Sequence, residues 1–224
     1  MFKEILEIFK RHSALDEIGH DFVEMIQIAQ EMFTEATKCM EDGQPDPAVA
    51  DYLKQRDEKI NELEQQIRRR LYTHLLVSGT ADLSPALAFM SIVKDAERLG
   101  DFTKNIFNTL HRAKSIAPEP CHAQKIRMRK HIIKQFEHIQ DVIISHDEDR
   151  AREIVALSRR DQAECDQYIW AMVEGRNDVI ECNNPVACAL LFRFFKRVLS
   201  HLVHIATSVY MPLDKLDVFD EPGV

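Results

Sequence analysis

Hydrophobic side chains recur every three or four residues through most of this chain, the spacing that places them on one face of an α-helix. The long helices that this spacing predicts span residues 16–41, 47–78, 84–113, 121–144, 148–173 and 185–209. A shorter amphipathic helix is predicted over residues 2–11, and Ser84 before Pro85 has the form of a helix cap. Only six glycines and eight prolines interrupt 224 residues, so an all-α fold of few long helices is expected.

A proline pair divides the predicted helices into two groups of three. Pro118 and Pro120 lie between the third and fourth helices, and the helical pattern then repeats. Short turns between successive helices make them antiparallel neighbours. We therefore expect two tandem three-helix bundles, one in residues 1–116 and one in residues 117–213, followed by a flexible tail in residues 214–224.

Charge excludes nucleic acid as the main partner. The formal net charge is −8 at pH 7, whereas proteins that bind DNA or RNA usually present an extended basic surface. The basic clusters at residues 68–70 and 127–130 are short enough to belong to ordinary helix surfaces.

The location that the sequence predicts is the cytoplasm, with no transmembrane segment. Residues 1–11 are charged throughout and lack the apolar run of a signal peptide. The most apolar stretch, residues 186–192, is much shorter than the ~20 residues that span a bilayer. Five cysteines without a Cys-x-x-Cys pair fit a reducing compartment, where most of them would be packed thiols.

Oxygen-bearing side chains form a stripe on the predicted third helix. Glu97, Asp101 and Asn105 are four residues apart, so they share one face, and no base lies on that stripe. Gly100 in the same turn costs the helix roughly 1 kcal/mol relative to alanine. Close helix packing or room for a bound group is needed to explain this glycine.

The predicted second helix carries a matching stripe. Asp57, Asn61 and Glu64 lie at positions i, i+4 and i+7 of a helix that runs in the opposite direction. Oxygen ligands on facing helices are typical of bundle sites for iron or manganese, and magnesium or calcium also accepts them. The stripes contain no histidine, which makes zinc less favoured. A hydrated polar seam without metal is the alternative, and spacing alone leaves both open.

Several segments together resemble the PhoU family of phosphate-signalling proteins. They are residues 57–67, 83–87, 95–101 and Asn105 with Ile106, in the order and at the separations of that family. The resemblance covers most of the chain and implies two copies of a three-helix unit. It also implies a cytoplasmic regulator of phosphate uptake and phosphate-starvation signalling, which acts by protein contacts and not as an enzyme. The expected partners are the ATPase of a phosphate ABC transporter, a phosphate-sensing histidine kinase, or a second copy of the chain.

The resemblance also implies metal binding, because some family members hold iron or zinc clusters on paired acidic residues. The positions that match those ligands are Asp57, Asn61, Glu64, Glu97 and Asp101, with Asn105 supporting them by hydrogen bonding. The expected cofactor is a divalent or trivalent metal, namely iron, zinc, manganese or magnesium.

The second half departs from the family pattern. Lys196 and Ser200 stand where the repeat should supply an acidic pair, and a protonated lysine cannot bind a cation. Any family-type metal is therefore expected in the N-terminal half only. Asp161 with His201 and His204 is a second candidate site, although histidines on an apolar helix are more often hydrogen-bonded packing residues.

Two other functions stay open. One is a carboxylate-metal enzyme built on a helical bundle, and the other is a helical accessory subunit of a sodium-phosphate cotransporter. The chain has no glycine-rich phosphate loop, no Gly-x-Ser-x-Gly turn and no His-Glu-x-x-His pair, so a catalytic function has no motif to support it.

Overall fold

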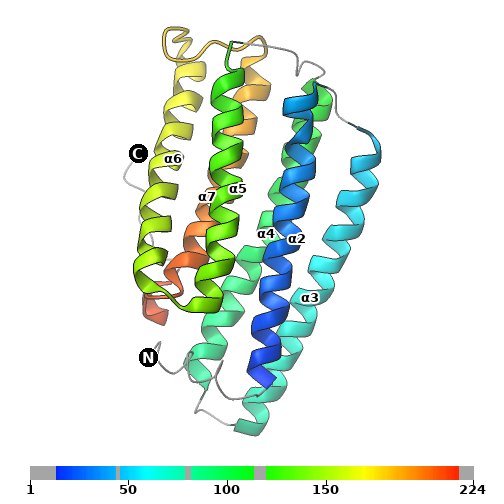
Figure 1. Cartoon of the computed structure of the whole chain (residues 1–224), viewed down its shortest axis with the longest axis vertical. Coiled ribbons are helices and arrows are strands. Elements are labelled where there is room, and N and C mark those ends of the chain that lie inside the picture. The colour runs from blue at the N-terminus through cyan, green and yellow to red at the C-terminus, as the bar shows by residue number, and fades with distance from the viewer. Residues whose placement is uncertain (1–13, 44–45, 79–81, 114–119, 217–224) are drawn as a thin grey trace.

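The computed structural model describes residues 14–43, 46–78, 82–113 and 120–216. Its six long helices lie roughly alongside one another, as Figure 1 shows. They are α2 (Ala14–Asp42), α3 (Ala48–Ser78), α4 (Leu83–Ala113), α5 (His122–Ser145), α6 (Glu148–Glu174) and α7 (Pro185–Thr207). The described residues contain no strand, which confirms the predicted all-α fold, and each helix ends within two residues of its predicted limit.

The two groups of three helices share one hydrophobic core. Helices α2, α3 and α4 pack together, as do α5, α6 and α7, while α4 also packs on α7 and α2 on α5. Phe33 of α2 shows how the groups meet, because its ring centroid lies 5.9 Å from those of both Phe136 on α5 and Phe195 on α7. That residues 1–116 and 117–213 are two separate repeat units stays a prediction.

Local sequence explains where several helices begin and end. Asn184 caps α7, since its side chain accepts a hydrogen bond from the Ala187 N–H, and Pro185 follows as the first helical residue. Gly175 closes α6 with a φ of 71°, a left-handed conformation that glycine adopts without strain. α4 begins at Leu83, so Ser84 lies inside its first turn and the prediction that Ser84 caps this helix was wrong by two residues.

Two predicted terminal features fall mostly outside the described residues. The amphipathic helix over residues 2–11 lies entirely outside them. The predicted tail, residues 214–224, begins within a short 3-10 helix, Leu213–Lys215, and the next residue, Leu216, is buried against the bundle. Among the described helices, none is long and apolar enough to cross a membrane.

Candidate functional site

The two oxygen-rich stripes lie against each other where α3 packs on α4. We call this region the α3–α4 seam, made of Asp57, Glu64, Glu97 and Asp101 together with Lys94 and Lys104. Antiparallel packing of the two helices is what brings acidic groups 33 and 44 residues apart in the sequence into contact with the same lysines.

Lys104 bridges one pair of these carboxylates. Its Nζ lies 2.7 Å from Asp57 Oδ2 and 3.0 Å from Asp101 Oδ1. Partial burial lowers the pKa of Lys104, but the hydrogen bonds to the two carboxylates outweigh this effect and the net pKa is raised. The ammonium group is therefore firmly charged and neutralises this end of the α3–α4 seam.

Lys94 performs the same role for the other pair. Its Nζ lies 2.8 Å from Glu97 Oε2 and 3.8 Å from Glu64 Oε2. Arg68 adds a contact of 2.9 Å to Glu64, and Arg98 lies 3.0 Å from Asp101. The absence of a base on the stripe therefore does not leave these acids without cationic partners. Long basic side chains three or four residues away reach over to them, although no base lies on the stripe itself.

The predicted amide ligands are placed differently from each other. Asn61 lies within the α3–α4 seam, where its Nδ2 is 3.5 Å from Asp57 Oδ2. Asn105 is exposed and lines a groove between α4 and α7, together with Asn184 and Phe194. Its position is therefore on the α7 side of α4 and not between α3 and α4.

Gly100 is explained by close helix packing. A Cβ atom at this position would lie 3.1 Å from Ile60 Cδ1 and 3.7 Å from both Asp57 Oδ1 and Met32 Cε. The missing side chain therefore lets α4 approach α3 and α2 at the level of the seam. Of the two explanations that the sequence left open, close packing is the one the structure supports.

The two histidines of the second candidate site contact a different carboxylate from the one predicted. His201 Nδ1 lies 2.7 Å and His204 Nδ1 3.2 Å from the same oxygen, Asp95 Oδ1. Asp161 on α6 instead contacts His131 on α5, with Nδ1 3.2 Å from its Oδ2. The predicted grouping of Asp161 with the histidines does not form, because α7 presents them to α4.

Asp95 is the functional candidate that sequence reasoning missed. It is buried, and burial raises its pKa, but hydrogen bonds from His201 and His204 outweigh burial and lower the net pKa. The His201 ring also stacks on Phe102, with centroids 5.4 Å apart. Two imidazoles and a carboxylate form a donor set that suits zinc or iron, and the same contacts tie α4 to α7 without any metal.

Comparison with known proteins identifies a domain of a known family. A sequence model described as PhoU domain matches residues 22–110, which contain the whole α3–α4 seam. The chain therefore carries a PhoU domain in its N-terminal half. "Phosphate-specific transport system accessory protein PhoU homolog 2" of Mycobacterium tuberculosis is 24% identical over 208 residues, which cover 88% of this chain and 93% of the relative. The PhoU homologue of Synechocystis is also 24% identical, over 88% of each chain.

Solved PhoU structures share the fold along almost the entire chain. PhoU from Pseudomonas aeruginosa superposes with a TM-score of 0.73 at 17% identity, covering 88% of this chain and 95% of that one. The phosphate transport system regulatory protein PhoU from Streptococcus pneumoniae gives 0.71 at 19% identity, with 92% and 97% covered. Both triplets of helices are therefore part of the PhoU architecture.

The helices α5–α7 hold an ion pair, with a buried lysine, where the family pattern has an acidic pair. Lys196 Nζ lies 2.8 Å from Asp166 Oδ2, and the lysine side chain is 10% exposed. The pair links α7 to α6. At this position a fixed ammonium group takes the place that a cation would otherwise occupy.

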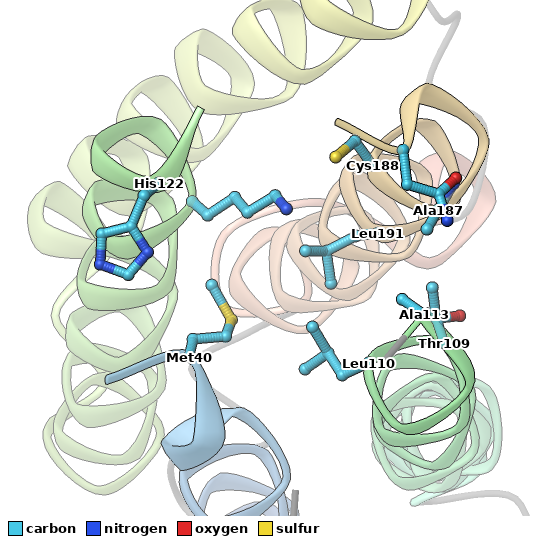
Figure 2. A pocket seen from close by; sticks show the side chains of 10 residues that line it. Met40, Thr109, Leu110, Ala113, His122, Ala187, Cys188 and Leu191 are labelled. Atoms are coloured by element: carbon cyan, nitrogen blue, oxygen red, sulfur yellow. The ribbon is translucent and has the colours of Figure 1, made fainter. Parts of the chain in front are cut away.

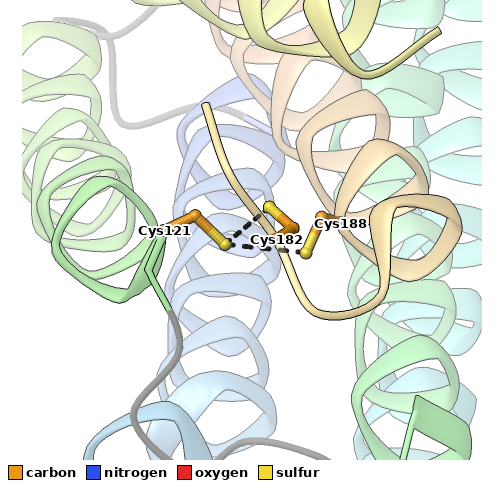
Figure 3. Close-up of side chains that lie close together, drawn as sticks. All are labelled: Cys121, Cys182 and Cys188. Atoms are coloured by element: carbon orange, nitrogen blue, oxygen red, sulfur yellow. Dashed lines mark hydrogen bonds between the residues drawn. The ribbon is translucent and has the colours of Figure 1, made fainter. Parts of the chain in front are cut away.

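A cysteine cluster is the second feature that sequence reasoning missed. Cys121, Cys182 and Cys188 meet at one end of the bundle (Figure 3), whereas the sequence led us to expect only that most of the cysteines are packed thiols. The order of the helices could have predicted this cluster, because in an antiparallel bundle the start of α5 and the start of α7 lie at the same end. Cys165 fits the original expectation, since burial raises its pKa and keeps it an inert thiol.

Proposed function

We propose that this chain regulates phosphate uptake and phosphate-responsive signalling through protein–protein contacts beside a phosphate transport system. The observation that carries the proposal is the extent of the likeness. Relatives named as accessory proteins of phosphate-specific transport align with 88% of the chain, across both triplets of helices. A protein similar along its full architecture is expected to share the general role of its relatives.

The geometry of the α3–α4 seam favours a contact surface over a catalytic centre. Its acidic groups are already paired with Lys94, Lys104, Arg68 and Arg98, and most of these bases are partly exposed. The basic side chains are 32–48% exposed, whereas the carboxylates of Asp57, Glu64 and Glu97 are only 11–16% exposed. The basic groups can therefore turn toward charged groups of a partner while the carboxylates stay in place.

A metal ion has a defined place in this proposal. A divalent or trivalent cation, confined to the N-terminal half, would bind the carboxylates of Asp57, Glu64, Glu97 and Asp101 after displacing the two lysine ammonium groups. The seam would then have two neutralised arrangements, one closed by lysine and one closed by metal. A partner that contacts only one arrangement would shift the balance between them.

A binding measurement tests the proposal. The purified full-length chain is cross-linked to membranes that contain the phosphate transporter or the sensor kinase, and the captured subunit is identified by mass spectrometry. We expect the transporter ATPase or the kinase to be captured by the wild type. Capture should fall at least several-fold in a double variant, Glu97→Ala with Asp101→Ala.

The matched control is Glu58→Ala with Glu62→Ala, which removes two exposed carboxylates of α3 outside the seam. Far-ultraviolet circular dichroism confirms that each variant keeps its helices. Equal capture by the seam variant and the wild type would contradict the proposed surface. Capture of a sodium-phosphate cotransporter instead would contradict the proposed partner.

A further inference from the structure

We infer that Cys121, Cys182 and Cys188 form a binding site for a thiophilic metal ion, with Zn²⁺ the ion that fits the geometry. The three thiols come from three separate segments: the residue before α5, the connection between α6 and α7, and the first turns of α7 (Figure 3). The site is distinct from the oxygen-rich α3–α4 seam and uses donors of the opposite chemical character.

The sulfur atoms already lie close to the separations of a zinc site. Cys121 Sγ is 3.7 Å from Cys188 Sγ and 2.7 Å from Cys182 Sγ. A tetrahedral ion with Zn–S bonds of about 2.3 Å holds its sulfurs about 3.8 Å apart. The first distance matches this value, and the second requires Cys182 to move outward by about 1 Å.

The burial of the three residues allows this adjustment. Cys121 and Cys188 are 0% and 1% exposed and are fixed in the core of the bundle end. Cys182 is only partly buried and belongs to a connection without regular structure. Two rigid ligands and one adjustable ligand give a site that an ion can enter from the solvent side.

Positive charge lies close to the three sulfurs. Cys121 lies at the N-terminus of α5, and Cys188 lies near the N-terminus of α7, so two helix dipoles place partial positive charge near the sulfurs. The buried Lys125 adds a full positive charge. These charges would stabilise thiolates that bind a metal ion.

A small cavity offers room for a fourth ligand. Its volume is about 20 Å³, and Cys188, Lys125 and His122 are among the residues that line it (Figure 2). A cavity of this size accepts a water molecule, which needs roughly 10 to 15 Å³ by the same measure. Such a water molecule can complete four-coordination.

The donor chemistry selects the ion. Thiolates are soft ligands that prefer zinc or cuprous copper over magnesium, calcium or manganese. Three thiolates carry three negative charges, so a bound Zn²⁺ leaves one, which Lys125 is placed to balance. Room for a fourth ligand favours tetrahedral zinc over a three-coordinate copper site. Zinc bound here would join α5, the α6–α7 connection and α7 at one end of the bundle.

Cobalt substitution tests this site and separates it from the seam. The reduced full-length protein is titrated with Co²⁺, whose thiolate complexes show a sulfur-to-metal charge-transfer absorption that carboxylate complexes lack. We expect one Co²⁺ per chain with this absorption, and its loss when one equivalent of Zn²⁺ displaces the cobalt. Cys182→Ala should lose the absorption, and circular dichroism should show intact helices.

Two control proteins should keep the absorption. Cys39→Ala removes a buried cysteine of α2 outside the cluster, and Glu97→Ala with Asp101→Ala disables the carboxylate seam. Absence of the charge-transfer band in the reduced wild type would overturn the inference, as would an undiminished band in Cys182→Ala. A Cys121–Cys182 disulfide in protein purified under reducing conditions would overturn it as well.

Discussion

At Gly100 the absence of a side chain sets the distance between α3 and α4. A Cβ at this position would press on Ile60 Cδ1 at 3.1 Å, which is the flexible end of a buried side chain. Alanine at position 100 would require only a small shift of the Ile60 side chain and would raise the helix propensity of α4. These two effects on the free energy of unfolding oppose each other. A larger side chain has no such compensation.

Gly100→Val is expected to lower the free energy of unfolding by about 1 to 3 kcal/mol, the usual range for overpacking a core. Urea denaturation followed by circular dichroism measures the change. Asn108→Val, at an exposed position of α4, is the matched control and should stay within about 0.5 kcal/mol of the wild type. A Gly100 variant as stable as this control would show that the helices do not approach closely here.

Asp95 makes folding stability depend on pH in acid. Its pKa in the folded protein is lowered by His201 and His204, so it lies below the unfolded value of about 3.9. The ionised carboxylate therefore stabilises the fold fully above about pH 4, and this contribution is lost as the pH falls through the lower folded pKa. Stability that rises with pH in this range is expected of an acid whose charged form is better hydrogen-bonded in the native state than in the unfolded state.

Asp95→Asn is expected to cost about 1 to 3 kcal/mol at pH 7, the range for hydrogen bonds to a charged group. The cost should shrink as the pH is lowered below about 4, because the wild type then loses the same contribution. Denaturation curves measured from pH 7 to pH 2 give both quantities. Asp178→Asn, at an exposed position between α6 and α7, is the control. A cost that stays constant with pH would contradict the role given to Asp95.

At the scale of the helices, α3 and α4 are joined by a seam in which lysines occupy the space between carboxylates. This arrangement makes a specific prediction about cations. If Lys94 and Lys104 compete with metal for the same oxygens, removing their charge must expose the acids to metal.

A double variant, Lys94→Gln with Lys104→Gln, is expected to bind Mn²⁺ several-fold to tenfold more tightly than the wild type, on the order of 1 kcal/mol. The shift in thermal midpoint with Mn²⁺ concentration measures the affinity. The same substitutions combined with Glu97→Ala and Asp101→Ala should abolish the gain. Equal Mn²⁺ affinities of the double variant and the wild type would contradict the proposal that the seam binds metal.

The helices also show what the sequence was able to predict. A period of 3.6 residues fixes the extent of a helix and the residues that share a face, so the six ranges and the two stripes were predictable. Partner choice between helices depends on tertiary packing, which is why Asp161 was assigned to His201 and His204 in place of Asp95. The spacing of residues within one helix likewise cannot predict that Lys104 of α4 contacts Asp57 of α3.

At the scale of the whole molecule, the two groups of three helices share one core and differ in chemistry. The group α2–α4 presents carboxylates on its α3–α4 seam, whereas α7 holds Lys196 paired with Asp166. The cysteine cluster lies in the group α5–α7 and the connections that adjoin it. Within the described residues, the chain thus combines an oxygen-rich surface in one group with a sulfur-rich site in the other.

The central claim is that this molecule restrains phosphate uptake through the α3–α4 seam, and uptake of labelled phosphate tests it most directly. Cells of the source organism that lack the gene are supplied with the wild type, Glu97→Ala with Asp101→Ala, or the control Glu58→Ala with Glu62→Ala. In phosphate-rich medium we expect the wild type and the control to lower the uptake rate, while the seam variant leaves it as high as in cells without the gene. An uptake rate that is the same with and without the wild-type protein would contradict the account.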